Sequence, residues 1–287
     1  MPRVDIGDIH LHYQQAGAGP DVIVLHALTS NLAIWFLTGA IQRLSNGFKV
    51  TAYDLRGHGM SDMTVRGYTS KAMAVDLLKL HERLGLGTVL VVGHSFGGLV
   101  ALHAAAMRPE VVAGVIMSDT YVPALAHLDQ EDEKDGLWLE LKQVMAHAGK
   151  EIGEKRDFQR LFDAAADLTP EEADIIKSNI DIPCGGWLEQ LAQLAGTKAS
   201  REAFEVAGLT PERISMIEQP VVAMYDQRTE FPHTCAFLLS NLKDCRRIAL
   251  PTARHLAPLE CSEAFVETVR LTLLELGEET RHAHREI

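Results

Sequence analysis

The chain has 287 residues, of which 47% are hydrophobic and 23% charged, a balance typical of a folded globular protein. Its 27 Lys and Arg residues against 39 Asp and Glu residues give a formal net charge of −12, which argues against a nucleic-acid partner or an anionic membrane surface. The N-terminus lacks an apolar leader, and no run approaches the ~18 apolar residues of a membrane span, so we expect a cytoplasmic protein. The four cysteines form no C-x-x-C pair, which favours reduced thiols.

Short apolar runs alternate with helical patterns along most of the chain. Strands are predicted at residues 9–15, 22–25, 50–53, 89–92, 112–117, 221–225 and 248–250. One helix is predicted to begin after Thr69 or Ser70 and to stop at Gly85, and another to cover Glu263–Leu276 and end at Gly277. This order is typical of an α/β protein with a mostly parallel sheet flanked by helices, and the first two strands are predicted to form an antiparallel hairpin at its edge.

The alternation stops within residues 123–213, where helical segments follow one another. Helices are predicted at 129–147, 155–165 and 187–194. Two more are predicted to begin after a capping box at Thr169 and Glu172 and after Thr210. We expect residues 123–213 to form an inserted helical cap, or lid. The core would then consist of residues 1–122 and 214–287.

The stretch Gly93-His94-Ser95-Phe96-Gly97 fits G-x-S-x-G and lies between a buried strand and an apolar helix. The two glycines allow neighbouring backbone segments to pass closely, so that the Ser95 hydroxyl projects above the sheet. The pattern predicts a nucleophile elbow. The structural alternative is a glycine-flanked turn between two core elements.

A serine nucleophile needs a base, and His255 is the best candidate. It follows the last predicted strand and precedes the last helix, which places it at the carboxyl edge of the sheet with the elbow. His94 is interpreted as the variable residue of the elbow, and His10 and His12 as structural residues of an outer strand. Neither His-x-His pair of the chain has a third ligand at metal spacing, so no metal site is predicted.

Three stretches together resemble the α/β-hydrolase superfamily over essentially the whole chain: the elbow, the segment Tyr53–Asp62, and the run that contains His255, Pro258 and Glu260. The chain is similar to the lid-bearing branch that holds small-molecule esterases, lactonases, C–C bond hydrolases and cofactor-free oxygenases. The resemblance implies an α/β-hydrolase fold and a reaction that needs no cofactor.

The same resemblance implies further roles for individual residues. The oxyanion hole would be formed by the backbone N–H groups of Phe96 and Leu28, the latter in a loop where Ala27 replaces the family's glycine. Arg56 and His58 would belong to a structural loop.

The position of the carboxylate that would orient His255 departs from the commonest family pattern. Many members carry an aspartate in a turn after the penultimate strand, where this chain has Thr229, and threonine cannot offset the charge of an imidazolium. Asp119 ends the strand that follows the elbow helix, and a minority of the superfamily carries the acid there. We therefore predict Asp119 as the acid, with Glu230 and then Asp226 as alternatives.

These residues predict a hydrolase that cleaves an ester or lactone of a small, largely apolar molecule through Ser95, His255 and Asp119. A C–C bond hydrolase, a cofactor-free dioxygenase that uses the His255–Asp119 pair as its base, and a non-catalytic ligand-binding protein are the alternatives. The expected partner is a small-molecule substrate, with homodimer formation left open. Three residues are expected to line the substrate pocket: Ala27, Tyr121 and Trp187.

Overall fold

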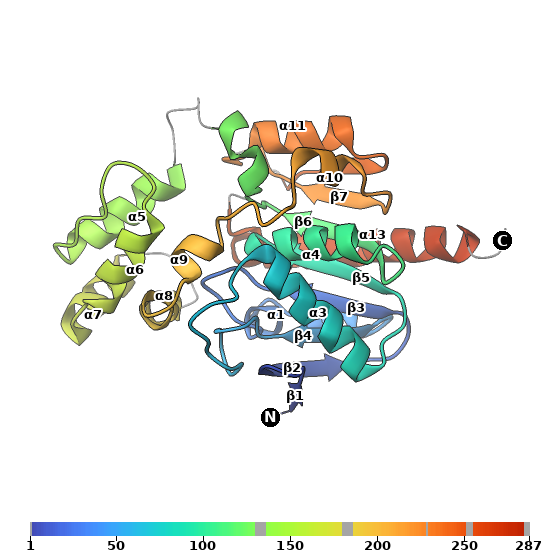
Figure 1. The fold of residues 1–287 in the computed structure, drawn as a ribbon, viewed down its shortest axis with the longest axis horizontal. Helices are drawn as coiled ribbons and strands as arrows, with labels where there is room; N and C mark the ends of the chain where they lie inside the picture. The colour runs from blue at the N-terminus through green and yellow to red at the C-terminus, as the bar shows by residue number, and fades with distance from the viewer. Residues whose placement is uncertain (1, 130–135, 180–185, 228, 251–254, 284–287) are drawn as a thin grey trace.

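The computed structural model describes residues 2–129, 136–179, 186–227, 229–250 and 255–283. In these ranges eight strands form one sheet in the order β1-β2-β4-β3-β5-β6-β7-β8, with helices packed on its faces (Figure 1). The strands are β1 (Arg3–Asp5), β2 (His10–Ala16), β3 (Asp21–Leu25), β4 (Lys49–Tyr53), β5 (Val89–His94), β6 (Val112–Ser118), β7 (Val221–Met224) and β8 (Cys245–Ile248). The pairs β1–β2 and β2–β4 are antiparallel, and every other neighbouring pair is parallel.

The sheet separates two apolar cores because successive side chains of a strand point to opposite faces. In β3, Ile23 and Leu25 belong to one core and Val22 and Val24 to the other. The first core is covered by α3 (Ser70–Leu84) and α4 (Phe96–Met107), and the second by α1 (Ile34–Leu37), α2 (Ala40–Leu44) and α13 (Ser262–Ala283). The predicted fold class, a mostly parallel sheet with helices on both faces, is confirmed.

Several helix ends agree with the sequence prediction. The Thr69 side chain accepts a hydrogen bond from the Ala72 N–H at 3.1 Å, and α3 ends at Gly85, whose φ of 60° suits glycine. The predicted capping box of Thr169 and Glu172 opens α7 (Pro170–Ser178).

Two edge predictions are wrong. The segment 9–15 does not form a hairpin with 22–25, because β3 is buried on both faces and lies between β4 and β5, whereas the half-exposed β2 is suited to a place near the edge. The last strand is Cys245–Ile248 rather than 248–250, since this edge strand lacks an apolar run.

The end predicted for the last helix is also wrong, because α13 continues through Gly277 to Ala283. An isolated glycine in a helix costs only about 1 kcal/mol relative to alanine, and the glutamates that follow it are good helix formers.

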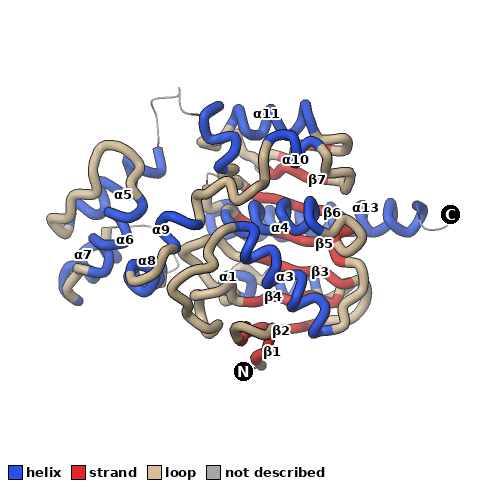
Figure 2. Tube along the Cα trace, in the orientation of Figure 1, coloured by secondary structure: helices blue, strands red, loops and turns tan. Residues whose placement is uncertain are grey.

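The segment between β6 and β7 contains helices and no strand in its described parts, and Figure 2 shows α5 to α8 grouped beside the sheet. We call residues 123–213 the helical insertion. Its role as a lid stays a prediction. The remaining helices of the described chain are η1 (Pro123–Leu128, a 3-10 helix), α5 (Gly136–His147), α6 (Phe158–Ala166), α8 (Trp187–Ala195), α9 (Ala199–Glu202), α10 (Pro211–Ser215), α11 (Pro232–Asn241) and α12 (Ala257–Glu260).

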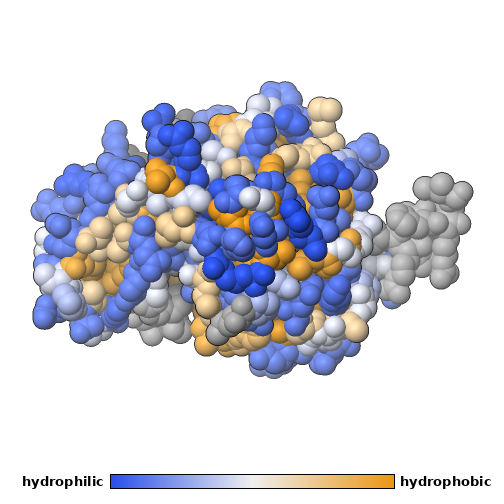
Figure 3. All heavy atoms as spheres, turned by 60° about the horizontal axis from the view of Figure 1, so that its bottom comes forward, coloured by the Kyte–Doolittle hydropathy of each residue, from blue (hydrophilic) through white to orange (hydrophobic). Residues whose placement is uncertain are grey.

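Hydrogen bonds tie the insertion to the core. Gln190 Nε2 donates to the Gly57 carbonyl at 2.9 Å, and Glu202 Oε2 accepts from the N–H groups of Gly67 and Tyr68 at 2.7 and 2.8 Å. None of the described helices is both long and apolar enough to cross a bilayer. On the face seen in Figure 3, apolar side chains form several groups separated by polar ones, as on most protein surfaces.

Candidate active site

Ser95 lies at the sharp turn between β5 and α4, with φ 52° and ψ −119°. Its N–H donates to the Ser118 carbonyl at 2.8 Å, which fixes the turn against the end of β6. A Cβ on Gly93 would lie 2.3 Å from the Gly97 carbonyl, so a side chain at position 93 would collide with backbone. The chain thus makes the strand-to-helix turn that the sequence predicted.

The start of α4 packs directly on the end of β3. A Cβ on Gly97 would lie 2.6 Å from the Leu25 carbonyl oxygen and 2.8 Å from that of His26. As the first residue of α4, Phe96 has an N–H that the helix itself does not use. The loop that carries Leu28 begins at the same point, so two elements with candidate oxyanion donors adjoin each other.

The Leu28 loop is held in place by His58. His58 Nε2 bonds the Leu28 carbonyl, and its Nδ1 lies 2.8 Å from the Arg56 carbonyl. Arg56 in turn donates to both carboxylate oxygens of Asp76, at 2.7 and 2.9 Å. Arg56 and His58 thus make structural contacts within and around the segment Tyr53–Asp62, in line with the expected structural loop. The contact of His58 with the Leu28 loop was not predicted.

His255 and Asp119 form a close pair. His255 Nδ1 lies 2.7 Å from Asp119 Oδ2, and the carboxylate is 1% exposed. Because an ionised carboxylate only accepts, Nδ1 carries the proton and Nε2 is the ring nitrogen that can act as a base. The Thr229 hydroxyl donates to Asp119 Oδ1, so each carboxylate oxygen has a donor. Thr229, the residue at the position where an aspartate was expected, thus contacts the Asp119 carboxylate.

The pKa shifts of His255 and Asp119 both favour the charged forms of the two side chains. Burial disfavours the charged form of His255, but the hydrogen bond and charge of Asp119 outweigh burial and raise the pKa of the imidazole. Burial likewise opposes ionisation of Asp119, and the bonds from His255 and Thr229 overcome it and lower the pKa of the carboxyl. The surroundings therefore favour a charged imidazolium beside a charged carboxylate, the state that forms after proton abstraction.

The other candidate carboxylates have different partners. Glu230 Oε2 lies 2.8 Å from Arg156 Nη2, and Asp226 Oδ1 accepts from the Leu250 N–H. Burial raises the pKa of Asp226 to about 6. The carboxylate hydrogen-bonded to His255 is that of Asp119.

His94 connects the elbow to the loop of His255, a role that the sequence did not reveal. Its Nε2 donates to the His255 carbonyl at 2.7 Å, and the two rings lie 5.4 Å apart. Burial lowers the pKa of His94 to about 4, so the ring is neutral. A G-x-S-x-G pattern accepts many residues at its second position, so nothing in the sequence marks this contact.

The predicted absence of a metal site concerned two His-x-His pairs. His284, of the pair His282 and His284, lies outside the described residues, and His10 and His12 each have a carboxylate partner. His10 Nδ1 lies 3.2 Å from Asp62 and His12 Nδ1 lies 2.7 Å from Asp54. Among the described residues no group of three His, Cys, Asp or Glu side chains is arranged to hold a metal ion.

Aromatic rings extend from His255 toward the insertion. Phe231 and His255 form a T-shaped contact with ring centroids 6.3 Å apart. Tyr121 lies 5.6 Å from Phe231 and 6.1 Å from Phe204, and Phe204 stacks on Phe158 at 3.8 Å. Sequence reasoning named Tyr121 but missed Phe204 and Phe231, which belong to no motif.

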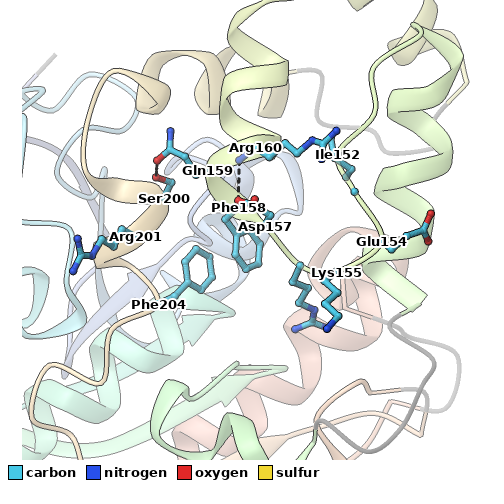
Figure 4. A pocket seen from close by; sticks show the side chains of 12 residues that line it. Ile152, Glu154, Lys155, Asp157, Phe158, Gln159, Arg160, Ser200, Arg201 and Phe204 are labelled. Atoms are coloured by element: carbon cyan, nitrogen blue, oxygen red, sulfur yellow. Dashed lines mark hydrogen bonds between the residues drawn. The ribbon is translucent and has the colours of Figure 1, made fainter.

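A cavity of about 630 Å³ lies at the far end of this aromatic row. Figure 4 shows the Phe158 and Phe204 rings side by side among charged side chains. Ala27, Tyr121 and Trp187, the residues expected to line a substrate pocket, do not line this cavity. Tyr121 packs on Phe204 and Phe231, Trp187 is buried at the start of α8, and Ala27 accepts the Ser30 N–H in the loop after β3. The twelve residues that line it, which we call the cationic pocket, are Ile152, Gly153, Glu154, Lys155, Arg156, Asp157, Phe158, Gln159, Arg160, Ser200, Arg201 and Phe204.

Comparison with known families identifies the fold. A sequence model described as the alpha/beta hydrolase fold matches residues 20–165, about half of the chain. The chain belongs to the α/β-hydrolase fold family. The matched segment includes the elbow and Asp119 and ends within the insertion.

The chain is similar in part to characterised members of this family. It is 39% identical over 117 residues to 2-(acetamidomethylene)succinate hydrolase of Mesorhizobium japonicum, covering 41% of each chain. It is 40% identical over 123 residues to lipase LipV of Mycobacterium tuberculosis, covering 41% of this chain and 43% of the lipase. The chain thus spans about two fifths of the length of these relatives.

Solved structures resemble nearly the whole fold. The crystal structure of E-2-(acetamidomethylene)succinate hydrolase covers 93% of this chain and 96% of its own, with a TM-score of 0.64 and 24% identity. An enol-lactonase from Burkholderia xenovorans LB400 covers 94% of this chain and 100% of its own, with a TM-score of 0.66 and 21% identity. At these identities the likeness establishes the fold.

Proposed function

We propose that this α/β-hydrolase cleaves an ester or lactone of a small molecule through an acyl-enzyme on Ser95. The 2.7 Å hydrogen bond between His255 and the buried Asp119 is the main support for this proposal. His94, next to Ser95 in the chain, hydrogen-bonds the His255 carbonyl and so links His255 to the elbow. A serine on a strained turn beside such a pair has the parts of a nucleophile with its general base.

In the proposed mechanism, His255 Nε2 takes the proton of Ser95 as Oγ attacks the substrate carbonyl. Asp119 stabilises the imidazolium that forms, and the N–H groups of Phe96 and Leu28 hold the tetrahedral oxyanion. His255 then gives its proton to the leaving alcohol. A water molecule, activated by the same histidine, hydrolyses the acyl-enzyme and restores Ser95.

The names of similar proteins support a hydrolase of this kind. They include the lipase and enol-lactonase above and a thermophilic esterase from Thermogutta terrifontis, which has a TM-score of 0.67 and 21% identity. An elbow that carries serine instead of a carboxylate also disfavours the alkyl-enzyme chemistry of haloalkane and epoxide opening.

The first test is Ser95→Ala, assayed with p-nitrophenyl esters. We expect kcat/KM to fall by about a thousandfold or more, because the members of such a triad act as a unit. The circular dichroism spectrum should remain that of the wild type. A variant that keeps most of the wild-type rate would contradict the assignment of Ser95 as the nucleophile.

Oxygen uptake separates the proposal from a cofactor-free dioxygenase built on the same His255–Asp119 pair. We expect ester hydrolysis without oxygen consumption. Oxygen-dependent turnover that survives in Ser95→Ala would instead favour the dioxygenase.

A further inference from the structure

The cationic pocket has the opposite charge to the molecule as a whole. The chain carries a net charge of −12, yet four cationic side chains line this pocket against two acidic ones. The four cations come from the segment before and within α6 and from α9: Lys155, Arg156, Arg160 and Arg201.

The two acidic residues of the pocket are already engaged with other groups. Glu154 bonds Lys142 Nζ, on α5. Asp157 is the N-cap of α6 and accepts the Arg160 N–H at 3.0 Å. Two of the cations are paired as well, Arg156 with Glu230 and Arg201 with Glu205. The excess of positive charge is therefore that of the lining residues themselves, four cations against two acids.

A row of aromatic side chains in contact lies between the pocket and the candidate catalytic pair. The rings of Phe158 and Phe204 stack at an interplanar angle of 6°, and Tyr121 and Phe231 continue the row to His255. Aromatic faces and edges pack well against the methylene or ring carbons of a ligand. A molecule whose scissile carbonyl lies near His255 could therefore extend toward the pocket along these rings.

Arg156 lies where the pocket and the row meet. Its guanidinium carbon is 5.8 Å from the centre of the Phe231 ring, and its Nη2 lies 2.8 Å from Glu230. These contacts orient the guanidinium. The charge of Glu230 raises the pKa of His255, and the charge of Arg156 lowers it by a smaller amount. A guanidinium has five N–H donors in a planar fork and can pair with two carboxylates at once.

We infer that the substrate is an ester or lactone that carries a carboxylate, and that Arg156 binds this carboxylate. This inference rests on the proposed function and adds the substrate class to it. The apolar part of the substrate lies along Phe204, Tyr121 and Phe231, and the carboxylate reaches Arg156 at the cationic pocket. Arg156 is thus a specificity-determining residue.

Two pairs of esters test the inference, each with a charged and a neutral member of similar size. The pair p-nitrophenyl hemiglutarate and p-nitrophenyl valerate carries the difference on the acyl side, and the pair m-acetoxybenzoate and m-tolyl acetate carries it on the alcohol side. We expect the wild type to prefer the charged member of at least one pair in kcat/KM. Arg156→Gln should reduce that preference about ten- to hundredfold, the effect of losing one hydrogen bond to a charged group.

Matched variants separate a local effect from a general one. Lys177→Gln removes another ion-paired cation of the insertion, one that is 34% exposed where Arg156 is 31% exposed, and it should leave the preference unchanged. Arg156→Lys should retain part of the preference, since it keeps the charge but loses the fork. Arg156→Gln combined with Glu230→Gln removes both charges of this ion pair and should behave as Arg156→Gln does.

Measuring how the esters bind to Ser95→Ala tests the carboxylate inference separately from the proposed hydrolase function. Calorimetric titration of Ser95→Ala with the same esters should give tighter binding of a charged member, and the added Arg156→Gln change should abolish the difference. Arg156-dependent binding of an ester that the wild type does not hydrolyse would count against the proposed function alone. Hydrolysis of both pairs with no charge preference, or with a preference that Arg156→Gln leaves intact, would overturn the carboxylate inference alone.

Discussion

Backbone strain in this molecule coincides with the candidate catalytic residues. Among the described residues three that are not glycine have positive φ, and two of them are Ser95 and Asp119, at 52° and 39°. Such conformations cost of order 1–3 kcal/mol each and persist where the surroundings over-determine them. Here the Ser95 and Asp119 N–H groups donate to carbonyls of neighbouring strands, at 2.8 and 3.0 Å.

The identity of the acid can be tested by a pair of isosteric substitutions. Asp119→Asn keeps the shape of the side chain but favours the wrong tautomer of His255, so we expect kcat to fall by up to about ten-thousandfold. Glu230→Gln should retain most of the activity, because Glu230 bonds Arg156. A nearly unaffected Asp119→Asn enzyme beside an inactive Glu230→Gln enzyme would reverse the assignment. Steady-state kinetics of the two variants decide between them.

The pH dependence of kcat/KM reports on His255. A general base must be neutral, and Asp119 raises the pKa of His255, so activity should rise with pH through a midpoint above the ~6.5 of an ordinary histidine. Removing the carboxylate favours the neutral ring. The residual activity of Asp119→Asn should therefore have its midpoint at lower pH, and a midpoint that is unchanged or higher would show that Asp119 does not act on His255.

At the scale of the element, the elbow depends on close contact between α4 and β3. Gly97→Ala would put a Cβ 2.6 Å from a backbone oxygen of β3, so something must shift. We expect a loss of about 1–3 kcal/mol in the free energy of unfolding and a lower kcat, because the Phe96 amide moves with the helix. Thermal unfolding and kinetics measure both effects.

Gly196→Ala is the matched control for this change. Nothing lies within 4 Å of the added methyl group, and the φ of Gly196, −73°, suits alanine. It should leave stability and kcat near the wild-type values. Equal losses in the two variants would mean that the contact at Gly97 has no special role.

The sequence predicted those elements that are determined by local signals. The buried β5, the turn at Ser95, the capped start of α3 and the capping box at Thr169 all depend on residues close together in the chain. The pairing of β2 with β4 and the position of β8 depend on which strands become neighbours, and periodicity does not contain that information.

At the level of the whole molecule, hydrogen bonds of Gln190, Lys198 and Glu202 are among those that attach the insertion to the core. Glu202 accepts two core N–H groups, so Glu202→Ala leaves both donors without this partner. If the insertion is a lid, this variant should raise KM for bulky esters more than it slows the reaction of Ser95 with a very small acylating reagent. Glu205→Ala, which removes an exposed neighbour paired with Arg201, is the control. Equal losses with small and bulky reagents would count against a lid.

The site illustrates the same limit on sequence reasoning. Ser95, Asp119 and His255 follow strands of one sheet, so parallel topology alone predicts that they gather at one edge. Arg156 and Phe231 come from segments about 75 residues apart, joined by tertiary packing that no motif encodes. Their place beside His255 becomes visible in the folded chain, and the substrate class inferred above depends on them.

Covalent labelling tests whether Ser95 is a nucleophile that His255 and Asp119 activate. The protein is treated with a fluorophosphonate, its intact mass is measured, and the modified peptide is sequenced by mass spectrometry. We expect one adduct per chain, located on Ser95, absent in Ser95→Ala and formed far more slowly in Asp119→Asn. A folded wild-type protein that remains unlabelled, or an adduct that persists in Ser95→Ala, would show that Ser95 is not an activated nucleophile.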